Sequence, residues 1–322
     1  MAESRRLLWR VENVLRLLSS YLEIPADELK SKSAEEQFGE ILMNENESIA
    51  KRMRTCFELK ALNTESAIDA LNVGLLFSDS ALLKHEIAYV LGQMRNKYAV
   101  KYLVNVLDNE QEETIVRHEC LEALGAIADI SDVDTLRLIE RYCKHPVVEL
   151  AETAQLALQC LEMAANNQRI ARSKYNSVDP APPFDDIEAY KHNLDKLQEI
   201  YLSPSHSLFK RYRAMFTLRD IGSNQCVDIL CLGLNDKSAL FRHEVAFVLG
   251  QMMNEHGIHS LHKVLQNESE SSMVRHEAAE ALGSIAKSEC KEIINHYVND
   301  SQAVVKESCI VANDIYDFWT TP

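Results

Sequence analysis

Four His-Glu pairs are the residues of this 322-residue chain whose types and spacing could do chemistry. They are His85-Glu86, His118-Glu119, His243-Glu244 and His276-Glu277. Within each half of the chain the two pairs are 33 residues apart, and corresponding pairs of the two halves are 158 residues apart. Imidazoles and carboxylates without a thiolate disfavour a closed structural zinc site and suit iron or manganese. The pairs therefore predict a metal centre.

The number of candidate ligands indicates what such a centre could do. Each half can supply two His and one Glu, the facial triad of non-haem iron enzymes. Two halves placed face to face would hold two metals about 3.5 to 4 Å apart. Eight candidate groups for six ligand positions leave two carboxylates free, and the spacing leaves open which two. Ionised carboxylates beside the metals would hold the ammonium groups of a cationic substrate.

Each pair stands at the head of an apolar run with helical spacing. After His85 the apolar residues follow at i, i+3, i+4 and i+7, which predicts a helix with one face in the core; they are Ile87, Val90, Leu91 and Met94. Equivalent helices of neighbouring repeats stack about 8 to 10 Å apart. We therefore expect His85 and His118 to project side by side, and likewise His243 and His276.

A short period inside a duplicated half predicts a repeat protein. Helical patterns of roughly 10 to 14 residues alternate with short polar breaks, which is typical of stacked helical hairpins. The expected fold is all-α, with HEAT-like helical-hairpin repeats in two pseudo-symmetric halves of about four repeats each that face a central metal site. The stretch RHEAAEALG is close to the scaffold pattern of HEAT-like repeats, including those of phycobilin lyases, so Glu277 and Glu280 could be architecture. The scaffold has no need of a His at this position.

The pattern divides the chain into four parts. Residues 1–32 form an N-terminal extension with a capping helix, for which a mitochondrial transit peptide is the alternative. Residues 33–163 and 191–322 are the two HEAT-like domains. Residues 164–190 are expected to be an exposed linker, because Pro180, Pro182 and Pro183 forbid a helix there.

Composition excludes several classes of function. The net charge of −15 argues against a nucleic-acid surface, which needs clustered Lys and Arg, and favours a basic partner. The eight Cys include no Cys-x-x-Cys motif and are expected to be reduced thiols in the core. No run of 18 apolar residues could span a bilayer, and the N-terminus lacks a secretory signal. We expect a cytoplasmic protein with no membrane partner.

The motifs together resemble one family, the deoxyhypusine hydroxylases. The resemblance rests on KHEIAYVLGQM and RHEVAFVLGQM, which open the two sets, on RHExxEALG, which closes each set, and on the linker SVDPAPP. It implies a HEAT-repeat di-iron monooxygenase that uses O2 and a reductant. The implied substrate and partner is translation initiation factor 5A, whose deoxyhypusine residue would be hydroxylated to hypusine. About 50 residues precede the first matching repeat, which is more than the family usually carries.

The resemblance also implies a role for each residue of the pairs. One Fe ion would be bound by His85, His118 and Glu119, and the other by His243, His276 and Glu277, with both ions as Fe²⁺ in the reduced state. Glu86 and Glu244 match the catalytic, substrate-binding carboxylates of the family. The main alternative is a non-catalytic HEAT scaffold that binds a basic protein, and a further one is a bilin-binding lyase-like protein. Neither alternative requires a His at four equivalent positions.

Overall fold

The computed structural model describes residues 33–166 and 173–321. The expected capping helix in residues 1–32 lies outside them. The described residues are helical and contain no β-strand, so the predicted all-α class is confirmed. In the same residues, no helix combines the length and the apolar character that crossing a membrane requires.

The described helices pair into four hairpins in each half, as the repeats predict. In the first half they are α2 (Ala34–Met43), α3 (Ile49–Leu62), α4 (Glu65–Phe77), α5 (Ala81–Met94), α6 (Val100–Leu107), α7 (Thr114–Ile127), α8 (Val133–Tyr142) and α9 (Val148–Ala165). In the second half they are α11 (Leu194–Leu202), α12 (Leu208–Ile221), α13 (Asn224–Leu232), α14 (Ala239–Met252), α15 (Ile258–Gln266), α16 (Ser272–Ile285), α17 (Ser288–Tyr297) and α18 (Ala303–Thr320). A short α10 (Ile187–Lys191) and the 3₁₀ turns Lys97–Ala99, Gly233–Asn235 and Glu255–Gly257 complete the set.

Equivalent serines begin the two helices that carry the first His of each half. The Ser80 hydroxyl accepts the Leu83 backbone N–H at 3.0 Å at the start of α5. The Ser238 hydroxyl accepts the Phe241 N–H at 3.0 Å at the start of α14. Each serine satisfies a backbone donor that has no partner within the helix. The caps therefore fix the same start, and so the same helical phase, for both helices.

Each hairpin has a first, outer helix and a second, inner helix. Four arginines on inner helices attach them to the outer helices that precede them. Each arginine Nε donates to the backbone carbonyl ten residues earlier, near the C-terminal end of the preceding helix, where carbonyls lack a partner within the helix. The pairs are Arg52 with Leu42, Arg117 with Leu107, Arg211 with Tyr201 and Arg275 with Leu265, all at 2.9 Å. The arginines that precede two of the His-Glu pairs are therefore structural.

Glycine sets the separation of the helices that carry the imidazoles. A Cβ added to Gly92 on α5 would lie 2.9 Å from the Cα of Ala123 on α7. In the second half, a Cβ on Gly250 of α14 would lie 3.0 Å from the Cα of Ala281 on α16. Because the opposing atoms belong to backbone, a larger residue would push the helices apart. The glycine of the LGQM sequence thus keeps neighbouring inner helices in close contact.

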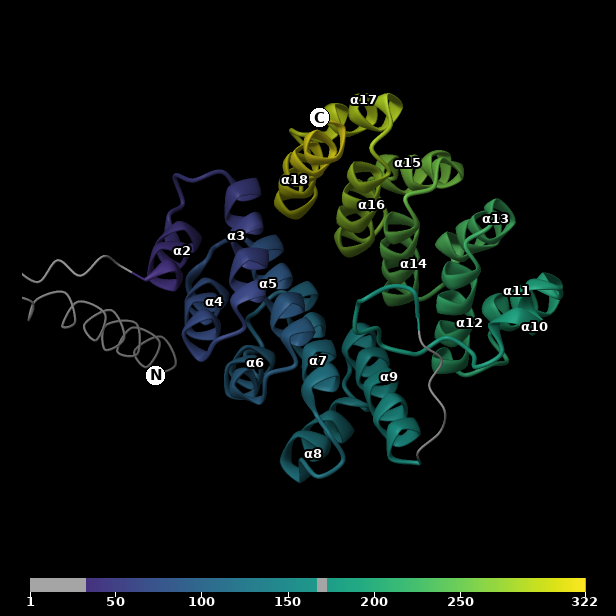
Figure 1. The fold of residues 1–322 in the computed structure, drawn as a ribbon, viewed down its shortest axis with the longest axis horizontal. Coiled ribbons are helices and arrows are strands. Elements are labelled where there is room, and N and C mark those ends of the chain that lie inside the picture. Colours follow the sequence, from purple (N-terminus) through teal and green to yellow (C-terminus); the bar gives the residue numbers. More distant parts are fainter. Residues whose placement is uncertain (1–32, 167–172, 322) are drawn as a thin grey trace, which may run out of the picture.

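The two halves face each other through their inner helices (Figure 1). At one seam α18 lies against α3 and α5, where Arg54 forms an ion pair with Asp314 at 2.8 Å. The Ser80 hydroxyl there donates to Glu307 at 2.6 Å. At the opposite seam α9 lies against α12 and α14, and Ser238 donates to Glu152 at 2.6 Å. The capping serines of α5 and α14 therefore also join the halves.

Within the expected linker, 164–190, residues 177–183 form a half-buried strap rather than an exposed segment. Gln93 of α5 accepts the Val178 N–H at 2.8 Å and donates to the Val178 carbonyl at 3.0 Å. Gln251, the equivalent residue of α14, donates to the Ser177 hydroxyl at 3.2 Å. The glutamines of both LGQM sequences therefore fasten one strap across the two halves, and the expectation of an exposed linker is wrong here.

Burial of the strap has two further physical causes. Ala181 and Pro183 are buried against the helices, and the Pro183 carbonyl accepts from Arg213 at 3.0 Å. Asp179 forms an ion pair at 2.7 Å with Arg219, whose side chain is fully buried. The prolines do exclude a helix, as predicted, but this non-helical segment packs and bonds as a structural element.

Candidate metal centre

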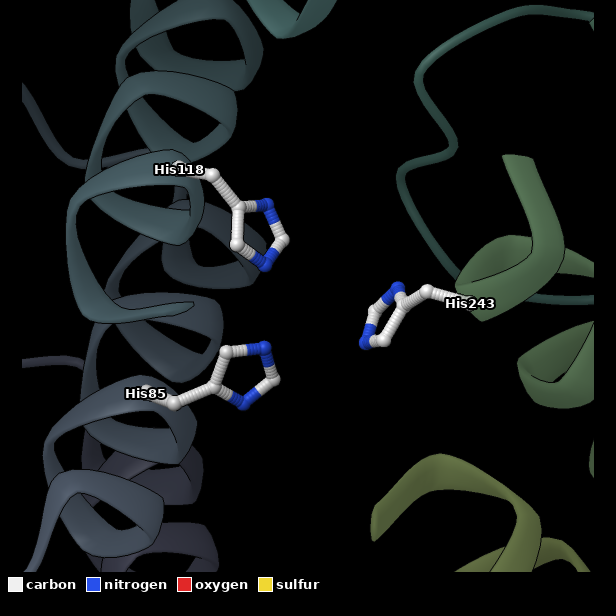
Figure 2. Close-up of side chains that lie close together, drawn as sticks. All are labelled: His85, His118 and His243. Carbon is white, nitrogen blue, oxygen red and sulfur yellow. The ribbon is translucent and has the colours of Figure 1, made fainter. Parts of the chain in front are cut away.

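The four imidazoles of the His-Glu pairs converge between the halves. His85 and His118 project from α5 and α7 toward His243 of α14, as Figure 2 shows, and His276 of α16 completes the group. Successive ring centroids are 5.5 Å apart for His85–His118, 5.4 Å for His118–His243, 5.2 Å for His243–His276 and 5.1 Å for His276–His85. The diagonal from His85 to His243 is 5.8 Å. The expected side-by-side projection within each half is therefore present, and the two halves also meet.

These rings are buried without hydrogen bonds. The relative exposure of His85, His118, His243 and His276 is 5%, 0%, 6% and 1%. Both nitrogens of all four rings lack a hydrogen-bond partner among the described residues. Buried polar atoms normally have a partner, because leaving one without costs about 1 to 3 kcal/mol. Eight such nitrogens in one place fit a site built to hold cations.

The carboxylate of the second pair in each half reaches the imidazole of the first. Glu119 Oε2 lies 3.4 Å from His85 Nε2. Glu277 Oε2 lies 3.5 Å from His243 Nε2 and 3.9 Å from His276 Nε2. Candidate ligand atoms of His243, His276 and Glu277 all lie within 4.8 Å of one another. Two imidazoles and one carboxylate thus converge on a common point in the second half.

Candidate ligand atoms of the first half also group, but less simply. Those of His85 and His118 lie within 4.8 Å of each other and of His243, which belongs to the opposite half. Those of His118 and Glu119 form a further group of the same size with Glu122. The structure therefore brings together the six residues expected to bind metal, and it places candidate ligand atoms of the two halves within 4.8 Å of each other.

A cavity of about 320 Å³ opens beside the imidazoles. Its polar wall carries six carboxylates, those of Glu86, Glu119, Glu122, Glu244, Glu277 and Glu280. Apolar residues of both halves complete the lining, among them Phe57, Tyr89, Phe247 and Trp319. A hollow of about 650 Å³ elsewhere in the second half has none of the four imidazoles in its wall. The smaller cavity is therefore the candidate functional site.

Sequence reasoning missed two residues of this wall, Glu122 and Glu280. The first received no role, and the second was regarded as possible architecture. Each follows a His by four residues, His118 in one case and His276 in the other, and residues four apart share a helix face. That spacing was the available signal.

Burial controls the charge of the site. It raises the pKa of Glu86 and of Glu119 to about 8 and that of Glu280 to about 7. It also lowers the pKa of all four histidines below their ordinary 6.5. Both shifts have the same cause, because a low-dielectric site disfavours the charged form of any group. Neutral imidazoles are ready to bind a metal, and bound cations would in turn ionise the carboxylates.

Comparisons with known proteins agree with this fold and site. A family model of HEAT repeats matches residues 73–159 and 227–312, and a model of the PBS lyase HEAT-like repeat matches residues 210–236. Deoxyhypusine hydroxylase of Candida albicans is 44% identical over 308 residues, which cover 91% of this chain and 96% of the relative. The human enzyme of that name is 43% identical over 283 residues, with coverages of 88% and 91%. The solved structure of human deoxyhypusine hydroxylase superposes with a TM-score of 0.83 at 42% identity and covers 88% of this chain and 96% of that one.

Fold and site together define a HEAT-repeat protein with a buried histidine and carboxylate centre between two halves. The chain belongs to the deoxyhypusine hydroxylases, a family of enzymes. The resemblance drawn from the four motifs is thereby confirmed. Membership of an enzyme family favours catalysis over the non-catalytic scaffold.

Proposed function

We propose that the protein hydroxylates the deoxyhypusine residue of translation initiation factor 5A with O2, a reductant and two bound Fe ions. The relatives carry the name of this activity. The observation that carries the proposal for this chain is the set of eight imidazole nitrogens, all buried and without hydrogen-bond partners in the described residues, beside raised-pKa carboxylates. Such a set suits metal ions that need neutral nitrogen and anionic oxygen ligands.

Each half supplies one set of ligands in this proposal. His243, His276 and Glu277 would hold one Fe ion, and their mutual distances of at most 4.8 Å support the assignment. His85, His118 and Glu119 would hold the other; the 3.4 Å from His85 Nε2 to Glu119 Oε2 supports that set. Three protein ligands leave further positions of each ion open. The ions, when bound, supply the activation of O2 for insertion into a C–H bond.

Glu86 and Glu244 are the carboxylates that we assign to the substrate. Both line the cavity, yet no ion pair links either of them to an imidazole among the described residues, whereas Glu119 and Glu277 both make such contacts. They stand at equivalent places on opposite halves, so that one extended side chain could reach both. Deoxyhypusine carries a secondary and a primary amine, and an ammonium group forms strong charge-assisted hydrogen bonds to carboxylates.

The protein contributes position and exclusion of water. Glu86 and Glu244 are 9% and 4% exposed, so a bound ammonium group would be largely removed from solvent. A low dielectric strengthens its attraction to the carboxylates, and their raised pKa falls back once a cation is bound. Two anchored amines fix the carbon chain between them, which places one C–H bond for reaction.

The compartment follows from thiol chemistry. All eight cysteines are free in the described residues, which suits a reducing compartment. We infer that the protein acts in the cytoplasm. Its net charge of −15 favours a basic protein partner over nucleic acid.

A conversion assay tests the proposal. Initiation factor 5A carrying deoxyhypusine is incubated with the iron-loaded protein, a reductant and O2, and the factor's mass is measured. We expect the gain of one oxygen atom on the modified side chain, and none after chelation of the metal. An unmodified factor under all conditions, or equal conversion by metal-free protein, would overturn the proposal.

A further inference from the structure

His276 and Glu280 present two buried polar atoms to each other. Nδ1 of His276 and Oε1 of Glu280 are 3.8 Å apart, and neither has a hydrogen-bond partner in the part of the chain that the structure describes. That separation exceeds a hydrogen bond, which requires about 2.7 to 3.2 Å. A small rotation of either side chain would close the gap and satisfy both atoms. The histidine is 1% exposed, so its Nδ1 has little access to water; the buried Ser308 hydroxyl is a further neighbour that could bond Glu280.

The two nitrogens of this imidazole face different carboxylates. Nε2 of His276 lies 3.9 Å from Glu277, the proposed ligand, whereas Nδ1 faces Glu280. A neutral imidazole carries one N–H and one lone pair. If the proton stays on Nδ1, the lone pair of Nε2 is directed toward the metal. A carboxylate that accepts the Nδ1–H would therefore leave Nε2 free to bind a metal.

The first half has a looser counterpart of this pair in Glu122. It follows His118 by four residues on α7, and the two residues have candidate ligand atoms within 4.8 Å. The other two imidazoles differ, because the residues four positions after His85 and His243 are Tyr89 and Phe247. Of the four imidazoles, the two that are followed four positions later by a carboxylate are thus the two most buried, with exposures of 0% and 1%.

We propose that Glu280 and Glu122 are positioning residues that accept the Nδ1–H of His276 and His118 and so present Nε2 of each ring to the metal. The inference rests on the proposed metal centre and adds to it two residues that are neither ligands nor anchors of the substrate. Partners of this kind in metalloproteins typically change metal affinity 10- to 100-fold when they are removed.

The test compares two side chains of similar size at one position. Glu280→Gln retains an oxygen that can accept the Nδ1–H, whereas Glu280→Met fills the same space without an oxygen that can accept it. Metal-free protein is titrated with Co²⁺, whose visible absorption reports binding and coordination. We expect Glu280→Met to weaken one of the two Co²⁺ sites about 10- to 100-fold, and Glu280→Gln to weaken it only a few-fold. The same pair of substitutions at Glu122 should act on the other site.

Glu289→Met is the matched control, since it makes the same exchange at an exposed residue of α17 that does not line the cavity. Its Co²⁺ affinity should equal that of the unchanged protein. A second readout needs no variant: ¹⁵N spectra of the metal-free protein should show His118 and His276 with the proton on Nδ1. The spectra remain decisive if Glu280→Met does not fold.

Several outcomes would overturn the inference. Equal Co²⁺ affinity of Glu280→Met and unchanged protein would show that the carboxylate does not act on the ring. Equal loss of one bound Co²⁺ in the Met and Gln variants would make Glu280 a ligand itself. Loss of substrate binding with unchanged Co²⁺ affinity would make it an anchor of the substrate amine. A proton on Nε2 in the spectra would contradict the proposed orientation. Absence of Co²⁺ and iron binding by the unchanged protein would instead overturn the proposed function.

Discussion

His243 Nε2 lies 3.5 Å from Oε2 of Glu277, although the two residues are on different helices and 34 positions apart in the chain. The first half repeats this contact between His85 and Glu119 at 3.4 Å. In both halves the carboxylate of the second His-Glu pair thus contacts the imidazole of the first pair. The relationship provides a structural basis for dividing four similar glutamates into two kinds.

The first prediction follows from that division. Glu119→Ala and Glu277→Ala should each lose bound iron, because each removes a proposed anionic ligand. Glu86→Ala and Glu244→Ala should keep the iron and lose binding of the deoxyhypusine-bearing factor. Iron per chain and binding of the factor are measured on all four variants. Equal iron loss in the four would contradict the division.

The second prediction concerns the spacing of the helices that carry the imidazoles. Gly92→Ala should lower the free energy of unfolding by about 1 to 3 kcal/mol, because the new Cβ would meet backbone. It should also weaken metal binding by moving His85 away from His118. Gly39→Ala is the control: its Cβ would meet Ala70 at an ordinary 3.5 Å, and the helix should gain about 0.5 to 1 kcal/mol. Urea unfolding and metal titration measure both effects, and an unchanged metal affinity of Gly92→Ala would contradict the argument.

Much of this architecture could be predicted from the sequence, because repetition is a strong signal. The spacing of the four pairs fixed a helical repeat and the convergence of His85, His118, His243 and His276. Spacing could not divide the glutamates, because contacts such as that of His243 with Glu277 depend on side-chain directions between two helices. The resemblance supplied the division that spacing left open.

Other features depended on contacts between segments far apart in the chain. The prolines of the strap correctly excluded a helix, but its burial arises from Gln93 and Gln251, which lie in different halves. The i, i+4 spacing of Glu122 and Glu280 from their histidines was visible in the sequence. A glutamate on a HEAT-like helix is common enough that the spacing alone did not mark it as part of the site.

The third prediction concerns pH. Folding raises the pKa of Glu119 from its ordinary 4.5 to about 8, so within that window the folded metal-free protein binds more protons than the unfolded chain. Its free energy of unfolding should therefore fall as pH rises through the window. The histidines act oppositely, since their lowered pKa makes stability rise with pH, but they do so only up to about 6.5. The melting temperature of the metal-free protein should thus fall from pH 6.5 to 8.

Metal binding should reverse this trend, because ligands must lose their protons to bind. Calorimetric titrations at pH 7 in buffers of different ionisation enthalpy measure the protons released. We expect release of more than one proton when both sites fill. A melting temperature of the metal-free protein that rises between pH 6.5 and 8, or binding without proton release, would contradict the raised carboxylate pKa.

The fourth prediction concerns the seams between the halves. Glu307→Ala and Glu152→Ala each remove an acceptor for the serine that caps α5 or α14, and leave the cap itself intact. Each change should lower the free energy of unfolding by about 1.5 to 3 kcal/mol, the range of a hydrogen bond to a charged group. Because the seams are separate, the effects should add in the double variant. Urea unfolding measures this, with Glu289→Ala, a change on α17 away from both seams, as the control; no change in either variant would contradict the assigned role.

The most direct test of the account is the iron content of the purified, iron-reconstituted protein, measured by elemental analysis together with that of His118→Ala. His296→Ala, an exposed histidine on α17, is the matched control. The account predicts two irons per chain in the unchanged protein and in the control, and fewer in His118→Ala, with loss of turnover. An unchanged protein that binds no iron, or a His118→Ala variant that keeps two irons and full turnover, would contradict it.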